Sequence, residues 1–195
     1  MGKIVPRWEW RAFGDEFGEA DASFAAMEPT GLQESDEVYL VSSIPDKVVK
    51  VRAGLMDVKS LERVDEAGLE QWLPVLKVRI PVSPEDADRF RATLGLPLRT
   101  SDKESYSVEE LVAELTALLP ELRAVPVHKK RLRFSVGGCT AEMTEVVVEG
   151  RRSRTVAIES ENPDRVVAAV KHLGLSGRDN TSYPRWLKNA AGLEV

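Results

Sequence analysis

Polar and apolar residues alternate with a period of two in eight segments of the chain, which is typical of β-strands with one apolar face. In one of them, Lys129, Arg131 and Arg133 fall on one face and Leu132 and Phe134 on the other. The glycines at positions 137 and 138 then predict a hairpin turn. The eight expected strands cover residues 4–13, 37–42, 47–53, 55–61, 74–82, 126–136, 139–150 and 154–161.

Helix signals lie between and after these strands. Ser83 and Asn162 each stand directly before a proline, as an N-cap does before the first helical residue. Ser107 and Glu110 have the spacing of a capping box. We expect helices after these three positions, a short helix within residues 16–27 and a closing helix within 182–192. The pattern leaves residues 62–72 open between a helix and an extended loop.

The composition is that of an ordinary globular protein, with 43% hydrophobic and 30% charged residues. A length of 195 residues favours one domain, residues 1–195. No apolar run is long enough to cross a membrane, and the first ten residues lack the apolar region of a signal peptide, so we expect a cytoplasmic protein without membrane contact. Cys139 is the only cysteine, which excludes an internal disulfide and a cysteine-based metal cage.

The charge of the strands changes this ordinary picture. The chain carries a formal charge of −5, yet the polar faces of seven of the eight expected strands carry ten basic and five acidic residues. The basic ones are Arg7, Arg11, Lys50, Arg52, Lys59, Lys77, Arg79, Lys129, Arg131 and Arg133. The acidic ones are Glu9, Asp57, Glu142, Glu159 and Glu161.

Eight strands can close into a barrel whose interior is just wide enough for side chains or one small ligand. If the charged faces line such a lumen, each close pair of like charges costs roughly 1 to 4 kcal/mol, and an anion or the interspersed carboxylates must offset this repulsion. Arginine and lysine side chains that converge from several directions suit a polyphosphate. Carboxylates in the same cavity suit a divalent cation that is shared with phosphate oxygens.

The charged positions also resemble a known family. Residues 7–11, "RWEWR", are similar to the ExExK motif of the CYTH family, the triphosphate tunnel metalloenzymes, with Glu9 as the second glutamate and Arg11 for the lysine. Further matches follow in the family's order along nearly the whole chain. They are Lys50 and Arg52, Lys59, Lys129 and Arg131, Glu142, Glu159 with Glu161, and the closing segment "NTSYPRWLK" at 180–188.

The resemblance implies an α+β fold in which an eight-stranded antiparallel β tunnel has its helices packed outside. It also implies a triphosphate substrate and Mg²⁺ or Mn²⁺ as cofactor. Glu9, Glu142, Glu159 and Glu161 would hold the cation, and Glu9 and Glu159 would be the catalytic carboxylates. The residues expected to bind substrate are Arg11, Lys50, Arg52, Lys59, Arg79, Lys129, Arg131 and Arg133.

Three departures from the family pattern bear on activity. Arg7, Thr144 and Ala157 stand where the family has carboxylates. The first hypothesis is a metal-dependent hydrolase of inorganic, thiamine or nucleoside triphosphate, which we favour over an adenylate cyclase. The alternative is a phosphate- or polyphosphate-binding regulatory protein of the same fold without turnover. A nucleic-acid contact through residues 126–136 is disfavoured, since Phe134 lies on the opposite face from Arg131 and Arg133. Ser182 and Tyr183 are candidates for the tunnel mouth, although Ser182 fits a helix cap equally well.

Overall fold

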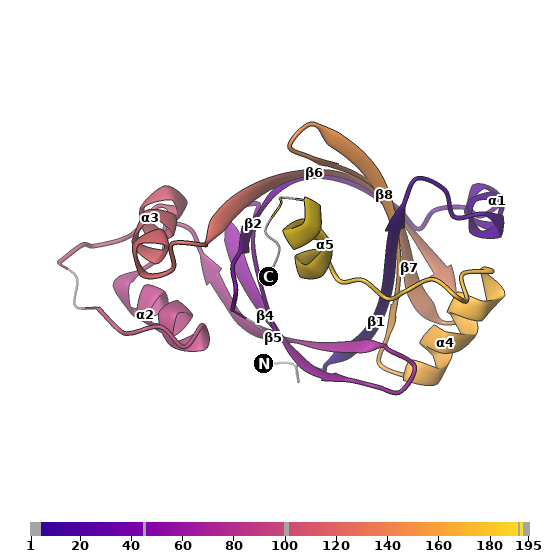
Figure 1. The fold of residues 1–195 in the computed structure, drawn as a ribbon, viewed down its shortest axis with the longest axis horizontal. Helices are drawn as coiled ribbons and strands as arrows, with labels where there is room; N and C mark the ends of the chain where they lie inside the picture. The colour runs from indigo at the N-terminus through magenta and orange to yellow at the C-terminus, as the bar shows by residue number, and fades with distance from the viewer. Residues whose placement is uncertain (1–4, 45, 100–101, 191, 193–195) are drawn as a thin grey trace.

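Eight antiparallel strands close into a barrel in the order β1-β5-β4-β3-β2-β6-β7-β8 (Figure 1). The structure, a computed structural model, describes residues 5–44, 46–99, 102–190 and 192. All eight strands that the alternation predicts are present, so the α+β tunnel is confirmed. The strands are β1 (Arg7–Gly14), β2 (Gly31–Val41), β3 (Lys47–Arg52), β4 (Leu55–Val64), β5 (Glu70–Arg79), β6 (Arg123–Val136), β7 (Cys139–Val148) and β8 (Arg151–Ser160).

The strand boundaries differ from the expected ones where a partner strand extends the ladder. β2 begins at Gly31, six residues before the alternation becomes clear, because it pairs with β6 along its whole length. Residues 62–72, which the pattern left open, are the end of β4 and the start of β5, joined by a turn at Gly68 with a positive φ of 77°. Ile4 and Ala191, at the ends of two expected elements, lie outside the described residues.

Five helices complete the described chain, and the cap signals locate three of them. Ser83 Oγ accepts a hydrogen bond from the Asp86 amide, and Asn162 Oδ1 accepts from the Asp164 amide. The capping box of Ser107 is also formed. The helices are α1 (Glu19–Ala25), α2 (Pro84–Thr93), α3 (Val108–Leu118), α4 (Pro163–His172) and α5 (Tyr183–Ala190). None of these helices has the length and apolarity of a membrane span.

Two apolar clusters attach helices to the outside of the barrel. Trp8 and Trp10 of β1 belong to the cluster that includes α1 and α4. Met56 and Val58 of β4 pack with residues of α2 and α3. The apolar faces of the strands are therefore covered on two sides of the barrel, and the opposite faces of the same strands turn inward.

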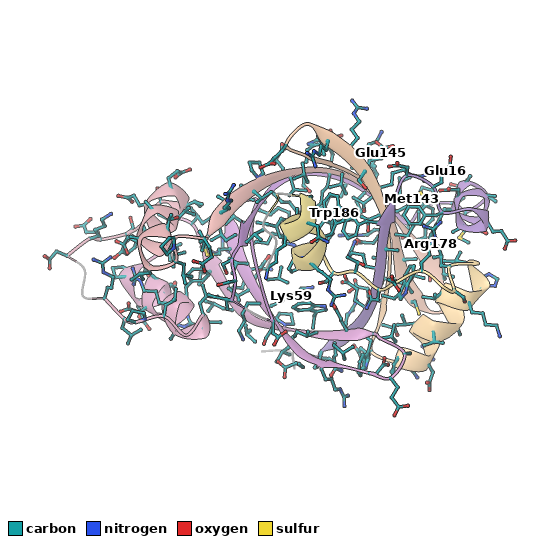
Figure 2. All side chains as sticks on the ribbon, in the orientation of Figure 1. Glu16, Lys59, Met143, Glu145, Arg178 and Trp186 are labelled. Carbon is teal, nitrogen blue, oxygen red and sulfur yellow. The ribbon has the colours of Figure 1, made fainter. Side chains whose placement is uncertain are left out.

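The fifth helix has a different place. Figure 1 shows α5 within the ring of strands, and its Tyr183 and Leu187 pack with Tyr39, Val125 and other residues of β2, β6 and β7. Figure 2 likewise shows Trp186 of α5 and Lys59 of β4 inside the ring, with Glu145 outside it. The closing helix thus covers one end of the barrel and leaves the charged part of the lumen beside it.

Candidate functional site

The charged strand faces line one cavity of about 640 Å³ in the lumen. Among the described residues, nine basic and four acidic side chains line it. The basic side chains are Arg11, Lys50, Arg52, Lys59, Lys77, Arg89, Lys129, Arg131 and Arg133, and the acidic ones are Glu9, Asp57, Glu142 and Glu159. The structure therefore brings together seven of the eight expected substrate-binding residues and three of the four expected cation ligands.

Two of the sequence-predicted residues lie elsewhere. Arg79 is the last residue of β5, is exposed, and does not line the cavity. Glu161 follows the end of β8 at Ser160, is exposed, and is likewise absent from the cavity wall. Both residues have the correct alternation, but Arg79 is at the end of β5 and Glu161 is just past the end of β8, and neither side chain reaches the cavity.

A buried carboxylate holds the basic side of the lumen together. Glu37 of β2 accepts a hydrogen bond from Lys129 Nζ at 2.9 Å and one from Arg52 Nη1 at 3.2 Å. Arg131 Nη2 lies 3.7 Å and Lys50 Nζ 4.0 Å from the same carboxylate. We call these five residues the Glu37 cluster. Burial alone would raise the pKa of Glu37, but the surrounding cations, Lys129 foremost, lower it to about 2. The carboxylate is thus charged and serves as a fixed counter-ion.

Lysine 129 is the most enclosed cation of this cluster. Its Nζ donates to Tyr39 Oη at 2.7 Å and lies 3.7 Å from the centroid of the Tyr183 ring. Burial holds the pKa of Lys129 well below its usual value, although Glu37 acts in the opposite direction. Burial also lowers the pKa of Lys50. One buried carboxylate therefore does not fully compensate the cations, and a further anion in the cavity would favour their charged forms.

Three carboxylates on β1, β7 and β8 form the neighbouring part of the wall, and each contacts an arginine. Glu9 of β1 accepts from Arg11 Nε at 2.8 Å, and Glu142 of β7 lies 3.2 Å from Arg131 Nε. Glu159 of β8 has the weakest of these contacts, 3.7 Å to Arg7 Nη1, and the Arg7 side chain is 50% exposed. We call Glu9, Glu142 and Glu159 the carboxylate wall.

The two neighbouring glutamates of this wall differ in proton affinity. Glu9 and Glu159 are direct cross-strand partners on β1 and β8, a position in which side chains face each other at close range. Burial would raise the pKa of Glu9, but Arg11 and Lys59 outweigh it and lower the pKa. For Glu159, burial raises the pKa and the Glu9 carboxylate raises it further. Such a pair suits acid–base chemistry, since Glu159 accepts a proton more readily than Glu9 does.

The donor set fits a divalent cation only when phosphate oxygens complete the coordination. Within the described ranges, no three or more His, Cys, Asp or Glu side chains are close enough to form a protein-only metal site. Thr144 and Ala157 provide no carboxylate in the lumen, and the Arg7 guanidinium faces Glu159 instead. Mg²⁺, however, is commonly held by one or two carboxylates together with substrate phosphates and water. Glu9 and Glu159 meet that smaller requirement.

The segment before α5 ties the closing helix to the carboxylate wall. Asn180 Oδ1 accepts from the Arg11 amide at 2.7 Å, and Asn180 Nδ2 donates to the Gly68 carbonyl at 2.8 Å. The Thr181 amide donates to the Arg11 carbonyl at 2.7 Å. β1 and β5 are paired only over Arg7–Glu9, so this segment bridges the two strands where they separate. Ser182, the candidate cap, and Tyr183 both line the cavity, as expected.

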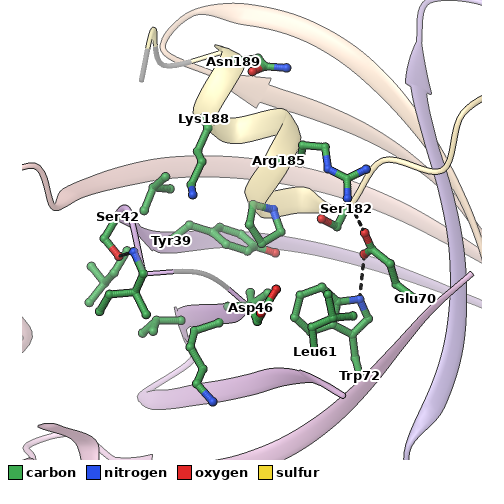
Figure 3. A pocket seen from close by; sticks show the side chains of 17 residues that line it. Tyr39, Ser42, Asp46, Leu61, Glu70, Trp72, Ser182, Arg185, Lys188 and Asn189 are labelled. Atoms are coloured by element: carbon green, nitrogen blue, oxygen red, sulfur yellow. Dashed lines mark hydrogen bonds and ion pairs between the residues drawn. The ribbon is translucent and has the colours of Figure 1, made fainter. Parts of the chain in front are cut away.

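A second cavity of about 560 Å³ lies between α5 and strands β2 to β5 (Figure 3). At its wall, Glu70 accepts from Arg185 Nη2 at 2.9 Å and from Trp72 Nε1 at 3.1 Å. Tyr39, Trp72 and Ser182 line both cavities, so the two spaces adjoin. A shift of register between β4 and β5 brings Trp72 into the lumen, where it lines the second cavity together with residues of α5.

Glu37 is the main residue that the sequence analysis missed. The expected strand at 37–42 was the one strand without a charged face, because its single glutamate stood at the predicted boundary. Glu37 and Tyr39 do have the spacing of a shared strand face. That spacing was the available signal, but only the closed barrel shows that the face is the inner one.

Two solved structures share this fold. A conserved hypothetical protein from Pyrococcus furiosus matches with a TM-score of 0.50 and 18% identity, over 91% of this chain and 98% of that one. An adenylyl cyclase candidate from Hippeastrum, described as having a dominant triphosphatase activity, matches with a TM-score of 0.50 and 12% identity, over 95% and 96% of the two chains. No family model and no curated protein matches the chain. At these identities the likeness supports the tunnel fold and does not extend to function.

Proposed function

We propose that the protein binds a small triphosphate in the lumen cavity and hydrolyses it with the help of a divalent cation. The observation that carries this proposal is the Glu37 cluster, in which four cations share one buried carboxylate beside a cavity with further basic side chains. Such an excess of converging cations suits a ligand with several negative charges. The triphosphatase activity described for the Hippeastrum neighbour agrees with this choice of ligand.

The basic residues have two roles in this proposal. Arg131 and Arg52 present guanidinium groups, which can each contact two phosphoryl oxygens, whereas Lys50, Lys59 and Lys129 act as point charges. Glu37 keeps these groups in place when no substrate is bound, because it offsets their mutual repulsion. The binding geometry is therefore formed before the substrate arrives, which reduces the cost of ordering the side chains on binding.

Glu159 is the proposed general base. A water molecule next to Glu159 attacks the terminal phosphorus, the bond from that phosphorus to the bridging oxygen breaks, and a water proton passes to the Glu159 carboxylate. The products are orthophosphate and the diphosphate. Without a bound cation, burial and the Glu9 carboxylate raise the pKa of Glu159, which favours uptake of a proton. Arg131 and Lys129 stabilise the negative charge on the leaving diphosphate oxygen.

Glu9 and Glu159 are the residues that would hold Mg²⁺ or Mn²⁺. When bound, such a cation neutralises charge on the phosphoryl oxygens and lowers the pKa of water. Arg11 fixes the orientation of Glu9 through the 2.8 Å hydrogen bond. The paired carboxylate therefore needs little reorganisation to act as a ligand.

A screen of phosphate release tests the proposal. Inorganic tripolyphosphate, thiamine triphosphate and ATP are each incubated with the protein and with Mg²⁺, Mn²⁺ or chelator, from neutral to alkaline pH. We expect cation-dependent release of orthophosphate from at least one of the three. The adjoining 560 Å³ cavity offers space for an organic group. Faster release from thiamine triphosphate or ATP than from inorganic tripolyphosphate would show that the organic group contributes to recognition. No release under any condition contradicts the hydrolase.

A second candidate function is anion binding without turnover. One observation favours this alternative: every carboxylate of the carboxylate wall contacts an arginine, and its negative charge is therefore partly neutralised. In that case tripolyphosphate raises the melting temperature equally with and without a divalent cation. A rise in melting temperature that requires the cation supports the hydrolase instead.

A further inference from the structure

Strand β1 carries Glu9 and Arg11 into the lumen, but one of its two edges is only partly covered by a partner strand. In the described part of the chain, its pairing with β5 ends at Glu9 opposite Glu70, whereas its pairing with β8 continues to Gly14. The backbone groups of an unpaired strand edge need other hydrogen-bond partners. The stretch from Glu9 to Arg11 therefore depends on a second support if its inward side chains are to keep a fixed position.

The side-chain amide of Asn180 provides this support. Its Oδ1 accepts from the Arg11 amide at 2.7 Å, and its Nδ2 donates to the Glu9 carbonyl at 3.3 Å and to the Gly68 carbonyl at 2.8 Å. The Thr181 amide donates to the Arg11 carbonyl at 2.7 Å. A carboxamide combines an acceptor with two donors, as the edge of a neighbouring strand does, so one side chain completes all three of its bonds.

Asn180 is itself held in place by α5. Its carbonyl accepts from Arg185 Nη1 at 3.0 Å, while Arg185 Nη2 donates to Glu70 at 2.9 Å. The guanidinium group thus links Asn180 to β5, the strand from which β1 has separated. The side chain and the main chain of Asn180 together connect β1, the turn at Gly68 and β5 at the point where the two strands part.

This support acts on one part of the lumen. Glu9 belongs to the carboxylate wall on β1, β7 and β8, whereas the Glu37 cluster is built on β2, β3 and β6. The main-chain position of Glu9 determines where its carboxylate lies relative to Glu159, its cross-strand partner. Loss of the Asn180 bonds should therefore disturb the pair of glutamates and leave the Glu37 cluster in place.

We propose that Asn180 is a positioning residue, which fixes the main chain around Glu9 so that Glu9 and Glu159 can share a divalent cation. This inference rests on the proposed function, because the cation site is part of that proposal. It assigns a role to the segment before α5 in addition to the closing of the barrel.

The test separates cation binding from phosphate binding in the full chain. The probe is a methylene-bridged, non-hydrolysable analogue of inorganic tripolyphosphate. Calorimetric titration measures its affinity without cation, and electron paramagnetic resonance measures Mn²⁺ binding in its presence. For Asn180→Ala we expect about tenfold weaker Mn²⁺ binding, as when a group that orients a metal ligand is removed. Its affinity for the analogue without cation should match that of the wild type.

Asn162→Ala is the matched control. Asn162 also makes side-chain hydrogen bonds to backbone groups, as the N-cap of α4, so its loss lowers stability. It is absent from the wall of the lumen cavity, and Asn162→Ala should bind both Mn²⁺ and the analogue as the wild type does. An equal fall in Mn²⁺ affinity in both variants would show a general effect of stability and would overturn the positioning role.

A second variant keeps the test open if Asn180→Ala does not fold. Asn180→Asp keeps the shape of the side chain and the acceptor for the Arg11 amide but loses both donors. Its added negative charge would by itself attract a cation, so weaker Mn²⁺ binding reflects the lost donors. Mn²⁺ binding as tight as in the wild type, in folded Asn180→Ala or in Asn180→Asp when the alanine variant cannot be measured, contradicts the inference.

Failure of the proposed function gives a different result. If the wild type binds the analogue but no Mn²⁺, the cation site fails and the positioning role fails with it. If the wild type does not bind the analogue, the polyphosphate site fails as well. Both results appear in the wild type itself, whereas failure of the inference alone appears only in the comparison with Asn180→Ala.

Discussion

The two walls of the lumen handle buried charge in opposite ways. In the Glu37 cluster, four cations share one carboxylate whose side chain is entirely buried. In the carboxylate wall, Glu9 contacts Arg11, whereas Glu142 shares Arg131 with the Glu37 cluster. Glu159 has only a long contact with the half-exposed Arg7. The first wall is compensated by its own buried carboxylate and, in our proposal, forms a fixed frame for anions. The second contains a carboxylate, Glu159, whose charge is poorly compensated and which is therefore available for a cation or a proton.

The largest expected effect comes from removing the counter-ion of the first wall. Glu37→Gln removes the buried carboxylate that four cations share, and a pKa of about 2 against an ordinary 4.5 corresponds to about 3 kcal/mol of stability near neutral pH. Chemical denaturation measures this loss. Glu34→Gln is the control on the same strand, because Glu34 is 64% exposed and should change stability by less than about 0.5 kcal/mol. Equal stability of Glu37→Gln and the wild type contradicts the compensated frame.

The same substitution has a defined pH dependence. The pKa of Glu37 is depressed in the folded state, so its contribution is complete above pH 4.5 and is lost as pH falls toward about 2. The stability difference between the wild type and Glu37→Gln should therefore shrink across that window. A difference that stays constant from pH 6 to pH 3 shows that the carboxylate is not the source of the effect.

Glu159→Gln removes one carboxylate of the carboxylate wall and should lower the rate of turnover. Loss of the general base lowers kcat by about 100-fold or more, with little change in stability. Glu161→Gln is the matched control, two residues further along the chain and exposed, and it should retain full activity. Phosphate release under the best cation conditions measures both. Equal losses in the two variants contradict the assignment of Glu159, and a loss in Glu161→Gln alone restores Glu161 as a ligand.

Arg7 has a smaller expected effect, which is on the pKa of Glu159. Arg7 lowers the pKa of Glu159 against the larger effects of burial and of Glu9, which raise it. Arg7→Gln should therefore raise this pKa further, so that the acidic limb of the pH–rate profile moves to higher pH by less than about one unit. A limb that moves to lower pH, or does not move, indicates that another group controls the profile.

The sequence predicts the strands better than it predicts the lumen. Alternation locates all eight strands, and the caps at Ser83, Ser107 and Asn162 locate three helices, because both signals depend on neighbouring residues alone. The inward direction of Lys50 and Lys129 could be predicted, because on their strands the charged residues all fall on one face and the apolar residues on the other. Closure of the barrel and the position of α5 depend on contacts between distant segments, which local patterns do not contain.

Individual site residues show the same difference between what local patterns predict and what depends on contacts between distant segments. Arg79 and Glu161 have the right period but stand at strand ends, where the wall no longer faces the cavity. No other charged residue lies on the same face of β2 as Glu37. Its role as the counter-ion is therefore visible only from its contacts with β3 and β6 in the folded barrel. Asn180 lies in the closing segment that the resemblance includes, and its hydrogen bonds to β1 become visible only in three dimensions.

Titration of inorganic tripolyphosphate into the wild type, Arg131→Ala and Arg79→Ala tests the central claim, a polyphosphate site in the lumen, most directly. We predict one site per chain for the wild type, with an affinity that falls as salt rises. Arg131→Ala should bind about 100-fold more weakly, because a charge-assisted contact is lost, and Arg79→Ala should bind normally because its side chain is outside the cavity. Absence of binding by the wild type, or equal binding by Arg131→Ala and the wild type, would contradict the account.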